Sequence, residues 1–287
     1  MTDLTTARSG PDQAAKAGVF RALHARAGAF LIPNPWDAGS ARILASLGFE
    51  ALATTSAGLA FALSRRDGAA GRAETLANAR AIMDATNLPV SADLENGFGD
   101  SPEVAAETIR LAAETGLVGG SIEDASGNPA RPIYDRVHAA ERVAAAVEAA
   151  RTLPFPFVLT ARAENFLHGR PDLDDTIARL QAFERAGADV LYAPGLPSLD
   201  AVRAVCAAVS RPVNVLAGGS GAAPSVAALA EAGVARISLG SALSRAALGG
   251  LVRAAREILE HGTFGFAADA LGFAEANGLM RPGAAVR

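Results

Sequence analysis

The sequence predicts a parallel (β/α)8 barrel of the TIM type, on two observations. Eight short apolar runs alternate with longer helical patterns along the 287 residues, the order expected of parallel strands joined by helices. A barrel of this kind takes about 250 residues, which the chain can supply. A doubly wound open sheet is the structural alternative. We interpret residues 1–287 as a single barrel domain with an extra N-terminal helix and a helical C-terminal extension at about 263–287.

The strands are expected where a short apolar run is bounded by small or polar residues. The runs are 29–34, 51–56, 89–95, 118–124, 157–164, 188–194, 212–217 and 235–240. Because helical stretches separate the runs, the strands should be parallel. The polar residues at the end of each run should therefore meet at one end of the barrel.

Helix signals separate these runs. Ser101 is a predicted N-cap with Pro102 at the first helical position, and Gly116 is the predicted stop. The stretch 11–28 should form the extra helix before the first strand, and 241–262 should form a helix that closes the barrel. The phenylalanines of the tail should pack on a partner subunit or, alternatively, dock on the chain's own barrel.

Composition excludes several classes of function. The net charge is −4 and there is no basic run, which argues against nucleic acid as a partner. With one cysteine, Cys206, no intrachain disulfide can form. No apolar run reaches the ~18 residues of a membrane helix, and the polar N-terminus does not resemble a signal peptide. We therefore expect a cytoplasmic protein without a membrane partner.

Acidic residues gather at the ends of the third, fourth and fifth runs. Asp93 and Glu95 share one side of the third run, Glu123 ends the fourth, and Arg162 and Glu164 share one side of the fifth. Crowded carboxylates repel unless a cation lies among them, and oxygen ligands without histidine favour Mg²⁺ or Mn²⁺. A magnesium site held by Asp93, Glu95 and Glu123 is therefore predicted. Helix caps and loop salt bridges are the alternative roles for these acids.

Two further segments could contact a substrate. Gly58, in the turn after the second run, allows close approach of the backbone to a ligand, and amides there could bind a carboxylate or phosphate. Asn214, on the seventh run, is a further substrate-binding candidate.

Five segments, taken in order, resemble the isocitrate lyase/phosphoenolpyruvate mutase superfamily. They are "IPNPWDAGSARILASLGFEALATTSAGLA", "SADLENGFGD", "GGSIEDASG", "LTARAENF" and "GADVLYAPGL". The resemblance spans nearly the whole chain. In relatives the strand-three motif commonly reads Asp-x-Asp-x-Gly-Tyr/Phe-Gly, so Glu95 here replaces an aspartate.

The resemblance implies roles for individual residues. Asp93, Glu95 and Glu123 match the metal site, and Asp67 matches the acid on the loop after strand two. Arg162 matches the arginine that contacts the substrate; with Asp67 and Glu164 it forms the catalytic set. The residues of the turn that binds one substrate carboxylate or phosphonate, together with a pocket-lining neighbour, are Ala57, Gly58, Leu59 and Thr55.

Two segments differ from the family pattern, and the differences limit the reactions to be expected. The loop after strand four, "DASGNPARPIYD", lacks the cysteine that serves isocitrate and methylisocitrate lyases as acid or base, so cleavage of isocitrate is not expected. In this loop Asn128 and Arg131 are the candidates for a distal substrate group. Where phosphonopyruvate-processing relatives carry a histidine near the end of strand six, this chain reads Tyr192-Ala193-Pro194, which weakens a phosphonate reading.

The resemblance thus implies a Mg²⁺-dependent enzyme that acts on a small 2-oxo carboxylate through an enolate. We expect carbon–carbon cleavage, either decarboxylation of an oxaloacetate-like acid or a lyase step on a substituted malate. Carbon–phosphorus chemistry, by a mutase or a hydrolase, is the alternative, and a non-catalytic 2-oxo-acid-binding protein is a third hypothesis. Relatives form tetramers that exchange the last barrel helix, so a homotetramer is expected.

Overall fold

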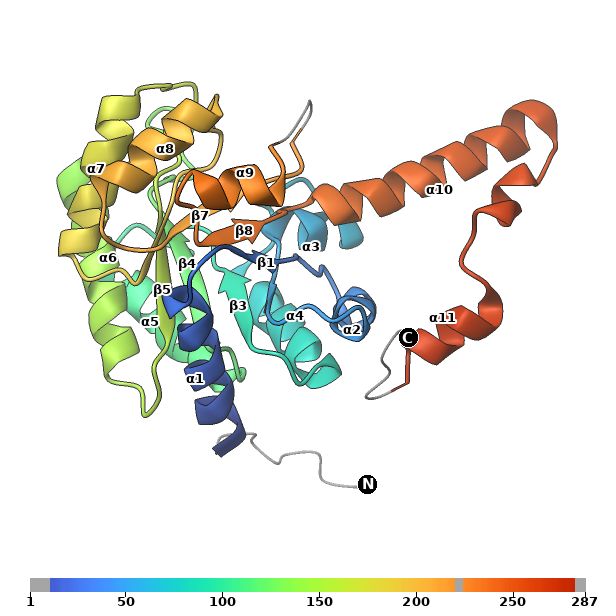
Figure 1. Cartoon of the computed structure of the whole chain (residues 1–287), viewed down its shortest axis with the longest axis horizontal. Helices are drawn as coiled ribbons and strands as arrows, with labels where there is room; N and C mark the ends of the chain where they lie inside the picture. The colour runs from blue at the N-terminus through green and yellow to red at the C-terminus, as the bar shows by residue number, and fades with distance from the viewer. Residues whose placement is uncertain (1–10, 220–223, 282–287) are drawn as a thin grey trace.

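The computed structural model describes residues 11–219 and 224–281. Eight parallel strands form its centre (Figure 1). They are β1 (Phe30–Ile32), β2 (Leu52–Ala53), β3 (Val90–Asp93), β4 (Gly119–Glu123), β5 (Val158–Arg162), β6 (Val190–Tyr192), β7 (Val213–Leu216) and β8 (Arg236–Ser238).

The strands pair in the order β1-β8-β7-β6-β5-β4-β3-β2, so β3 to β7 each lie between their sequence neighbours and β8 pairs with β1. The seam between β1 and β2 is closed by an Ala53 N–H that donates to the Pro33 carbonyl at 3.1 Å. The Asn34 amide reinforces it by donating to the Thr54 carbonyl at 3.0 Å. The predicted barrel is therefore confirmed, and the open-sheet alternative is excluded.

Helices connect and surround the strands. They are α2 (Ala38–Ser46), α3 (Ser56–Ala62), α4 (Arg72–Ala85), α5 (Pro102–Glu114), α6 (Arg136–Arg151), α7 (Leu173–Arg185), α8 (Leu199–Ala208) and α9 (Val226–Glu231). The α5 signals act as predicted, because the Ser101 side chain accepts from the Val104 N–H and Pro102 begins the helix. The main core lies between these helices and the sheet.

The extra N-terminal helix, α1 (Pro11–Ala25), covers the amino ends of the strands. Its Phe20 and Leu23 are buried against residues at the starts of the strands, Phe30, Val118 and Val158 among them. Burying a side chain of this size contributes roughly 1.5–3 kcal/mol. This end of the barrel is therefore sealed by apolar contacts, and the carboxyl ends of the strands form the accessible end.

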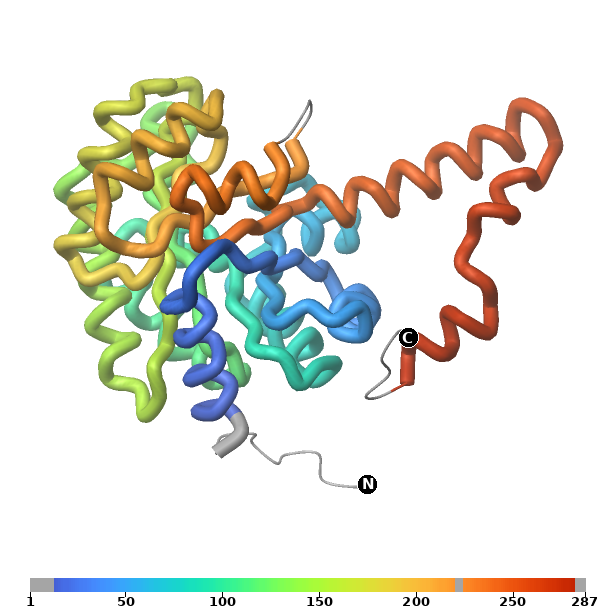
Figure 2. Tube along the Cα trace, viewed as in Figure 1, coloured from blue at the N-terminus to red at the C-terminus, as the bar shows by residue number. Residues whose placement is uncertain are grey.

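The segment after β8 departs from the prediction. Helix α10 (Ala242–His261) does not close the barrel but extends away from it, as Figures 1 and 2 show. Of the residues of α10, Ser244 alone is buried. Leu243, in its first turn, packs against the barrel core, but the apolar side chains further along the helix are exposed: Leu248, Leu251, Val252, Ile258 and Leu259. The prediction that 241–262 closes the barrel was therefore wrong.

A short 3-10 turn, η1 (Gly265–Ala268), and α11 (Phe273–Leu279) complete the described extension. α11 returns to the barrel, where Arg42 of α2 donates to the Met280 carbonyl at 2.6 Å. Phe273 nevertheless remains 87% exposed. The rest of the predicted extension, 282–287, lies outside the described residues. We call residues 242–281 the C-terminal arm.

Candidate active site

Charged side chains from three adjacent strands meet at the carboxyl end of the barrel. Arg162, the last residue of β5, donates from Nη1 to Asp93 Oδ1 of β3 at 2.8 Å, and the same nitrogen lies 3.3 Å from Glu123 Oε2 of β4. Arg162 Nε donates to Glu164 Oε1 at 2.9 Å. The four side chains are all largely withdrawn from solvent, with between 4% and 17% of their surface exposed. One guanidinium therefore holds three carboxylates in a fixed arrangement.

The turn after β3 directs Glu95 toward this cluster. Glu95, Gly97 and Phe98 all adopt positive φ, at 48°, 79° and 64°. Such a backbone is unfavourable for residues other than glycine, and a Cβ on Gly97 would lie 3.1 Å from the Ala105 Cα. The turn brings Glu95 Oε1 into a buried position without a hydrogen-bond partner among the described residues.

The carboxylates outnumber the cation that neutralises them. Burial, followed by repulsion from Asp93 and Asp67, raises the pKa of Glu95 to about 7. Burial raises the pKa of Glu123 well above its usual range against the opposing influence of Arg162. Asp67, on the loop between α3 and α4, also has a raised pKa through burial and the Asp93 charge. Excess negative charge of this kind favours an added cation.

The described residues fit a hard divalent cation, with one difference from the prediction. In residues 11–219 and 224–281 no three acidic, histidine or cysteine side chains lie close enough to form a metal cage, so Asp93, Glu95 and Glu123 are not assembled as a complete ligand set. Mg²⁺, however, usually binds through one or two carboxylates and keeps several waters. The unpartnered Glu95 oxygen and the repelling acids around it suit such a site.

The turn after β2 contributes two of the four expected residues, Thr55 and Ala57, to the cavity lining, and Gly58 and Leu59 do not line it. Thr55 caps α3, where its hydroxyl accepts the Gly58 N–H at 3.3 Å, and the Leu59 N–H is bonded to the Thr55 carbonyl. The amides of Gly58 and Leu59 are thus used within the helix, and the expected backbone nest is not formed there. Thr55 and Ala57 do line the barrel-mouth cavity. Gly58 serves packing instead, since a Cβ would meet Trp36 at 2.8 Å.

Ser56, which sequence reasoning missed, connects this turn to the acidic cluster. Its hydroxyl and its backbone N–H both donate to Asp93 Oδ2, at 2.9 Å and 3.3 Å. With Arg162 on Oδ1, both oxygens of Asp93 are held by hydrogen bonds. A serine beside a predicted strand end is too common a pattern to identify from sequence.

Asn214 lies deeper in the barrel, within a buried polar network. Its amide nitrogen donates to Ser238 Oγ at 3.0 Å, and its oxygen accepts from Arg236 Nε at 2.9 Å. Arg236 also donates to Thr160 Oγ1 at 2.9 Å. Burial lowers the pKa of Arg236 to about 10, so this guanidinium is still charged at neutral pH. Arg236 was missed in the sequence, although an arginine within an apolar strand is an unusual pattern.

The loop from Asp124 to Tyr134 folds into a hairpin beside the mouth, joined by a bridge between Ala125 and Ile133. Asn128 and Arg131, predicted to contact substrate, lie at its exposed end. They line a surface groove of about 890 Å³ beside the hairpin. The structure therefore does not bring these two residues together with the acidic cluster, because the hairpin directs its tip outward.

Two adjoining cavities mark the mouth. The inner one, about 260 Å³, reaches from Asp67 and Asp93 down to Asn214 and Arg236. The outer one, about 960 Å³, is bordered by Glu95, Glu123 and Glu164, and Arg162 lines both. The space beside the cluster is large enough for a small organic acid.

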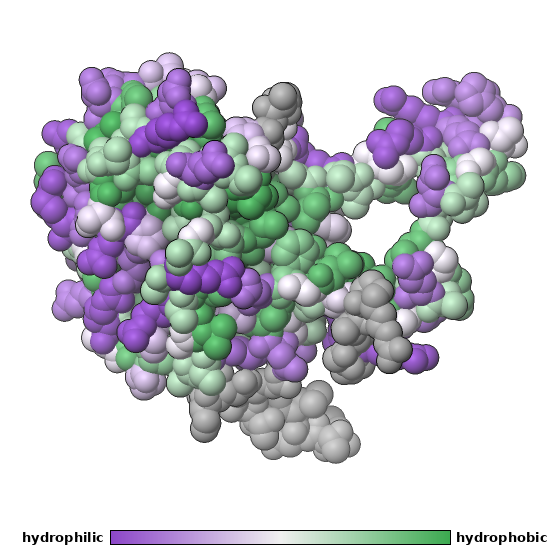
Figure 3. Space-filling model, in the orientation of Figure 1, coloured by the Kyte–Doolittle hydropathy of each residue, from purple (hydrophilic) through white to green (hydrophobic). Residues whose placement is uncertain are grey.

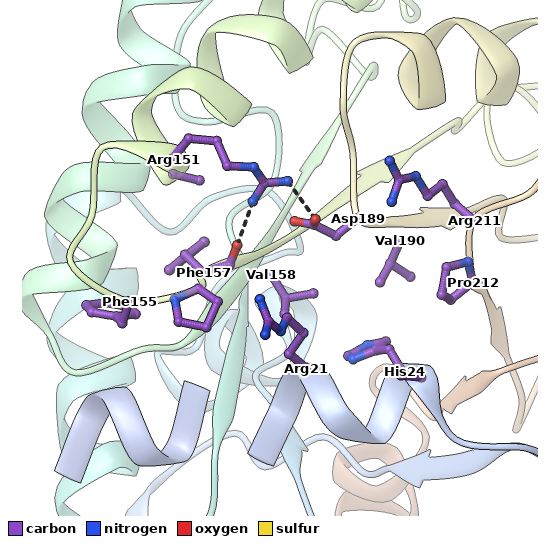
Figure 4. A pocket seen from close by; sticks show the side chains of 13 residues that line it. Arg21, His24, Arg151, Phe155, Phe157, Val158, Asp189, Val190, Arg211 and Pro212 are labelled. Carbon is purple, nitrogen blue, oxygen red and sulfur yellow. Dashed lines mark hydrogen bonds and ion pairs between the residues drawn. The ribbon is translucent and has the colours of Figure 1, made fainter. Parts of the chain in front are cut away.

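A third cavity lies at the opposite end of the barrel, and Figure 4 shows its lining. It has a volume of about 440 Å³ and is bordered by Arg21 of α1, Arg151 of α6 and Arg211. Arg151 is paired there with Asp189 at 2.6 Å. Since catalytic sites of these barrels occupy the carboxyl ends of the strands, this cavity is not the candidate active site.

Comparison with known proteins identifies the family of the chain. The model of the phosphoenolpyruvate phosphomutase family matches residues 20–259. The chain belongs to that family. The resemblance to the isocitrate lyase/phosphoenolpyruvate mutase superfamily is thereby confirmed, because the match covers the strands that carry the acidic cluster.

The similarity to individual relatives extends over two thirds or more of each chain. A solved structure from Burkholderia cenocepacia J2315, named only as a lyase or mutase, is 59% identical, with a TM-score of 0.92 over 93% of this chain and 96% of that one. The 2-methylisocitrate lyase of Escherichia coli is 30% identical over 68% of this chain and 67% of its own. An oxaloacetate acetylhydrolase, solved with its product oxalate, is 26% identical, with a TM-score of 0.82 over 92% and 93%. Family members thus include enzymes that cleave carbon–carbon bonds.

None of the helices in the described residues is both long and apolar enough to cross a membrane.

Proposed function

We propose that this protein is a Mg²⁺-dependent enzyme that cleaves a carbon–carbon bond of a small 2-oxo dicarboxylate through an enolate, with decarboxylation of an oxaloacetate-like acid as the first choice. A lyase step on a substituted malate is the second form of the same chemistry. The observation that carries the proposal is the Arg162 guanidinium, held between Asp93, Glu123 and Glu164 beside the inner cavity.

The metal and Arg162 would both stabilise negative charge on the substrate. Asp93, Glu95 and Glu123 would hold Mg²⁺ or Mn²⁺, with water completing the coordination. The bound cation would supply Lewis acidity toward the 2-oxo carboxylate. Arg162 is positioned to bind the substrate carboxylate and to stabilise the developing enolate oxygen, and Glu164 orients it through Nε. Ser56 keeps Asp93 in place.

Residues that border the inner cavity would contact the carboxylates of the substrate. Thr55 and Ala57 border the inner cavity on one side, and Asn214 borders it on another. The loop from Asp124 to Tyr134 contains no cysteine, lysine or histidine. Decarboxylation suits this arrangement because it starts by bond cleavage and does not need a strong base. Isocitrate and methylisocitrate should therefore not be cleaved.

Two other functions are tested together with this one. Carbon–phosphorus chemistry on phosphonopyruvate would also form an enolate beside Arg162, and a binding protein would keep the metal site without turnover. The similarity to oxaloacetate acetylhydrolase supports the carbon–carbon choice. We also propose that the chain acts as one barrel domain, 1–287, and that the C-terminal arm packs on a second copy within a homotetramer.

The experiment is a turnover screen with Mg²⁺ against oxaloacetate, phosphonopyruvate, 2,3-dimethylmalate, isocitrate and 2-methylisocitrate, with products identified by NMR. The proposal expects turnover of oxaloacetate or dimethylmalate that EDTA abolishes. Turnover of phosphonopyruvate well above that of oxaloacetate would support the carbon–phosphorus alternative. Release of glyoxylate from isocitrate would contradict the reading of the loop. Binding of every compound without turnover would support the binding protein.

A further inference from the structure

The phenol of Tyr192 lies in the inner cavity and has no role in the function proposed above. Tyr192 is the last residue of β6 and is 8% exposed. It lines the same 260 Å³ cavity as Asp93 and Arg162. The Arg162 guanidinium lies over its ring, with 5.1 Å between Cζ and the ring centroid. A cation placed on an aromatic face fixes the orientation of both groups.

The hydroxyl end of Tyr192 faces the polar network below the acidic cluster. Ser238 lines the same cavity and lowers the pKa of the phenol, and Ser238 accepts a hydrogen bond from Asn214. Arg236 joins this network by donating a hydrogen bond to Asn214. Within residues 11–219 and 224–281 Arg236 forms no salt bridge with a carboxylate, and an ionised Tyr192 would favour its charged form.

Two neighbours of Tyr192 would stabilise its phenolate form. Arg162 and Ser238 both favour the ionised phenol. Burial has the larger, opposite effect and raises the pKa of Tyr192 to about 12, so the residue holds its proton at neutral pH. A group that keeps its proton at rest and has cations ready to receive the resulting charge has the features of a general acid.

Other acids of the inner cavity are less suited to this task. Arg162 and Arg236 remain charged donors that do not give up protons at neutral pH. Asp93 is held on both oxygens by Ser56 and Arg162. Asp67 lines the rim of the cavity, where it is partly withdrawn from water but still accessible to solvent. Tyr192 is thus the neutral acid that the described residues place within the cavity.

We propose that Tyr192 is the proton donor that converts the enolate to the keto product. This inference rests on the proposed enolate chemistry. In the step, the Tyr192 O–H bond breaks and its proton passes to the substrate carbon next to the 2-oxo group. The electron pair of the enolate C=C bond forms the new C–H bond, and the enolate oxygen returns to a carbonyl. The O–H electrons remain on the phenolate beside Arg162 and Ser238, and water entering through the mouth reprotonates it.

The reverse of this proton transfer gives a test that does not depend on cleavage of a carbon–carbon bond. With pyruvate and Mg²⁺ in D₂O, the wild-type protein should exchange the C3 protons of pyruvate for deuterium, observed by NMR. Oxalate, which has the shape and charge of the enolate of pyruvate, measures binding separately. Tyr192→Phe keeps the ring under Arg162 and removes only the hydroxyl. Tyr134→Phe is the matched control, because Tyr134 is the other tyrosine of the chain and lines the surface groove beside the hairpin instead.

Tyr192→Phe is expected to slow the exchange by about 10²-fold or more, the usual contribution of a general acid. Its oxalate affinity and melting temperature should stay close to those of the wild type, and Tyr134→Phe should exchange within about threefold of it. Exchange by Tyr192→Phe at the wild-type rate would overturn the assignment, as would a wild-type protein that binds oxalate without exchanging pyruvate. Failure of the proposed function appears separately, as exchange of pyruvate without turnover of oxaloacetate or dimethylmalate.

Discussion

The barrel mouth and the C-terminal arm depart from ordinary protein surfaces in opposite ways. At the mouth, charged groups are buried, and the side chains of Arg162 and Glu164 are 13% and 4% exposed. On the arm, apolar groups are exposed, with Leu259 at 85% and Phe273 at 87%. Figure 3 shows apolar residues along the arm where it leaves the barrel and where it returns. Buried charge and exposed apolar surface both carry a cost in free energy.

The difference teaches which kind of partner each region requires. Carboxylates that repel one another are relieved by a cation or by protons, so the mouth should respond to metal and to pH. Apolar side chains are relieved by burial against another apolar surface, so the arm should respond to protein concentration. A substitution in one region should therefore leave the response of the other unchanged.

The largest effect is expected from removing a carboxylate at the mouth. Asp93→Ala should abolish Mg²⁺-dependent turnover, a loss of about 10³-fold or more, because Asp93 joins the proposed metal site to Arg162 and Ser56. The fold should persist, since Arg162 keeps Glu123 and Glu164. Turnover and melting temperature are measured with Mg²⁺ and with EDTA, with Asp200→Ala, an exposed acid, as control. Wild-type turnover by Asp93→Ala in EDTA would refute the metal site.

A smaller loss of activity is expected when residue 162 keeps its positive charge but its side chain changes shape. Arg162→Lys retains the charge but loses the planar fork that contacts Asp93 and Glu164 together. We expect kcat/KM to fall by about 10²-fold, measured with the substrate that the screen identifies. Activity within about threefold of the wild type, under ~0.7 kcal/mol, would remove Arg162 from the site.

The arm is tested by placing a charge on its apolar face. Leu251 of α10 is 66% exposed, and Val137 of α6 is 68% exposed. If the arm packs on a second copy, Leu251→Glu should weaken the assembly by about 10- to 100-fold, as expected when a buried leucine is lost. Val137→Glu, at equal exposure, should leave it unchanged. Sedimentation across a concentration series measures both. An assembly that tolerates Leu251→Glu as well as Val137→Glu would leave α10 outside the interface.

The contrast also explains what sequence reasoning could reach. The positions of the strands and of Asp93, Glu123, Arg162 and Glu164 follow from local patterns, because parallel strands bring their carboxyl ends together. The direction of α10 does not follow, since an amphipathic helix reads the same whether its apolar face meets its own barrel or another copy.

The other features that the sequence did not predict are contacts between residues far apart in the sequence. Arg236 and Asn214 meet across two strands, and Ser56 reaches Asp93 over 37 positions. The tip of the hairpin with Asn128 and Arg131 turns outward because Ala125 pairs with Ile133. Single-residue patterns do not encode such pairings.

The pH response of the mouth can be isolated at Glu95. Its pKa is raised to about 7 by burial and neighbouring carboxylates, so the folded protein binds this proton more tightly than the unfolded chain does. Stability of the metal-free protein should therefore fall between about pH 4.5 and pH 7 as Glu95 ionises. Glu95→Gln should raise the free energy of unfolding at pH 8 by about 1–2 kcal/mol, less than the full shift implies because the carboxyl still contacts water.

Urea unfolding in EDTA at pH 5 and pH 8 measures this effect. At pH 5 the variant and the wild type should be nearly equal, since Glu95 is then protonated. At pH 8, Mg²⁺ should stabilise the wild type more than Glu95→Gln. A variant that is less stable than the wild type at pH 8 without metal would show that Glu95 is not under electrostatic strain.

The smallest effect is expected at the edge of the mouth, where the hairpin carries Arg131. In this structure Arg131 lines the surface groove beside the hairpin, together with Arg170, and does not contact the acidic cluster. It can reach a distal carboxylate only if the hairpin moves, and such a contact would bind the ground state and the transition state alike. Arg131→Ala should then raise KM by about tenfold or less and leave kcat within about twofold, the signature of uniform binding. Arg170→Ala, from the same groove but outside the hairpin, should change neither constant. A fall in kcat as large as the rise in KM would instead give Arg131 a part in the transition state and make the hairpin an integral part of the mouth.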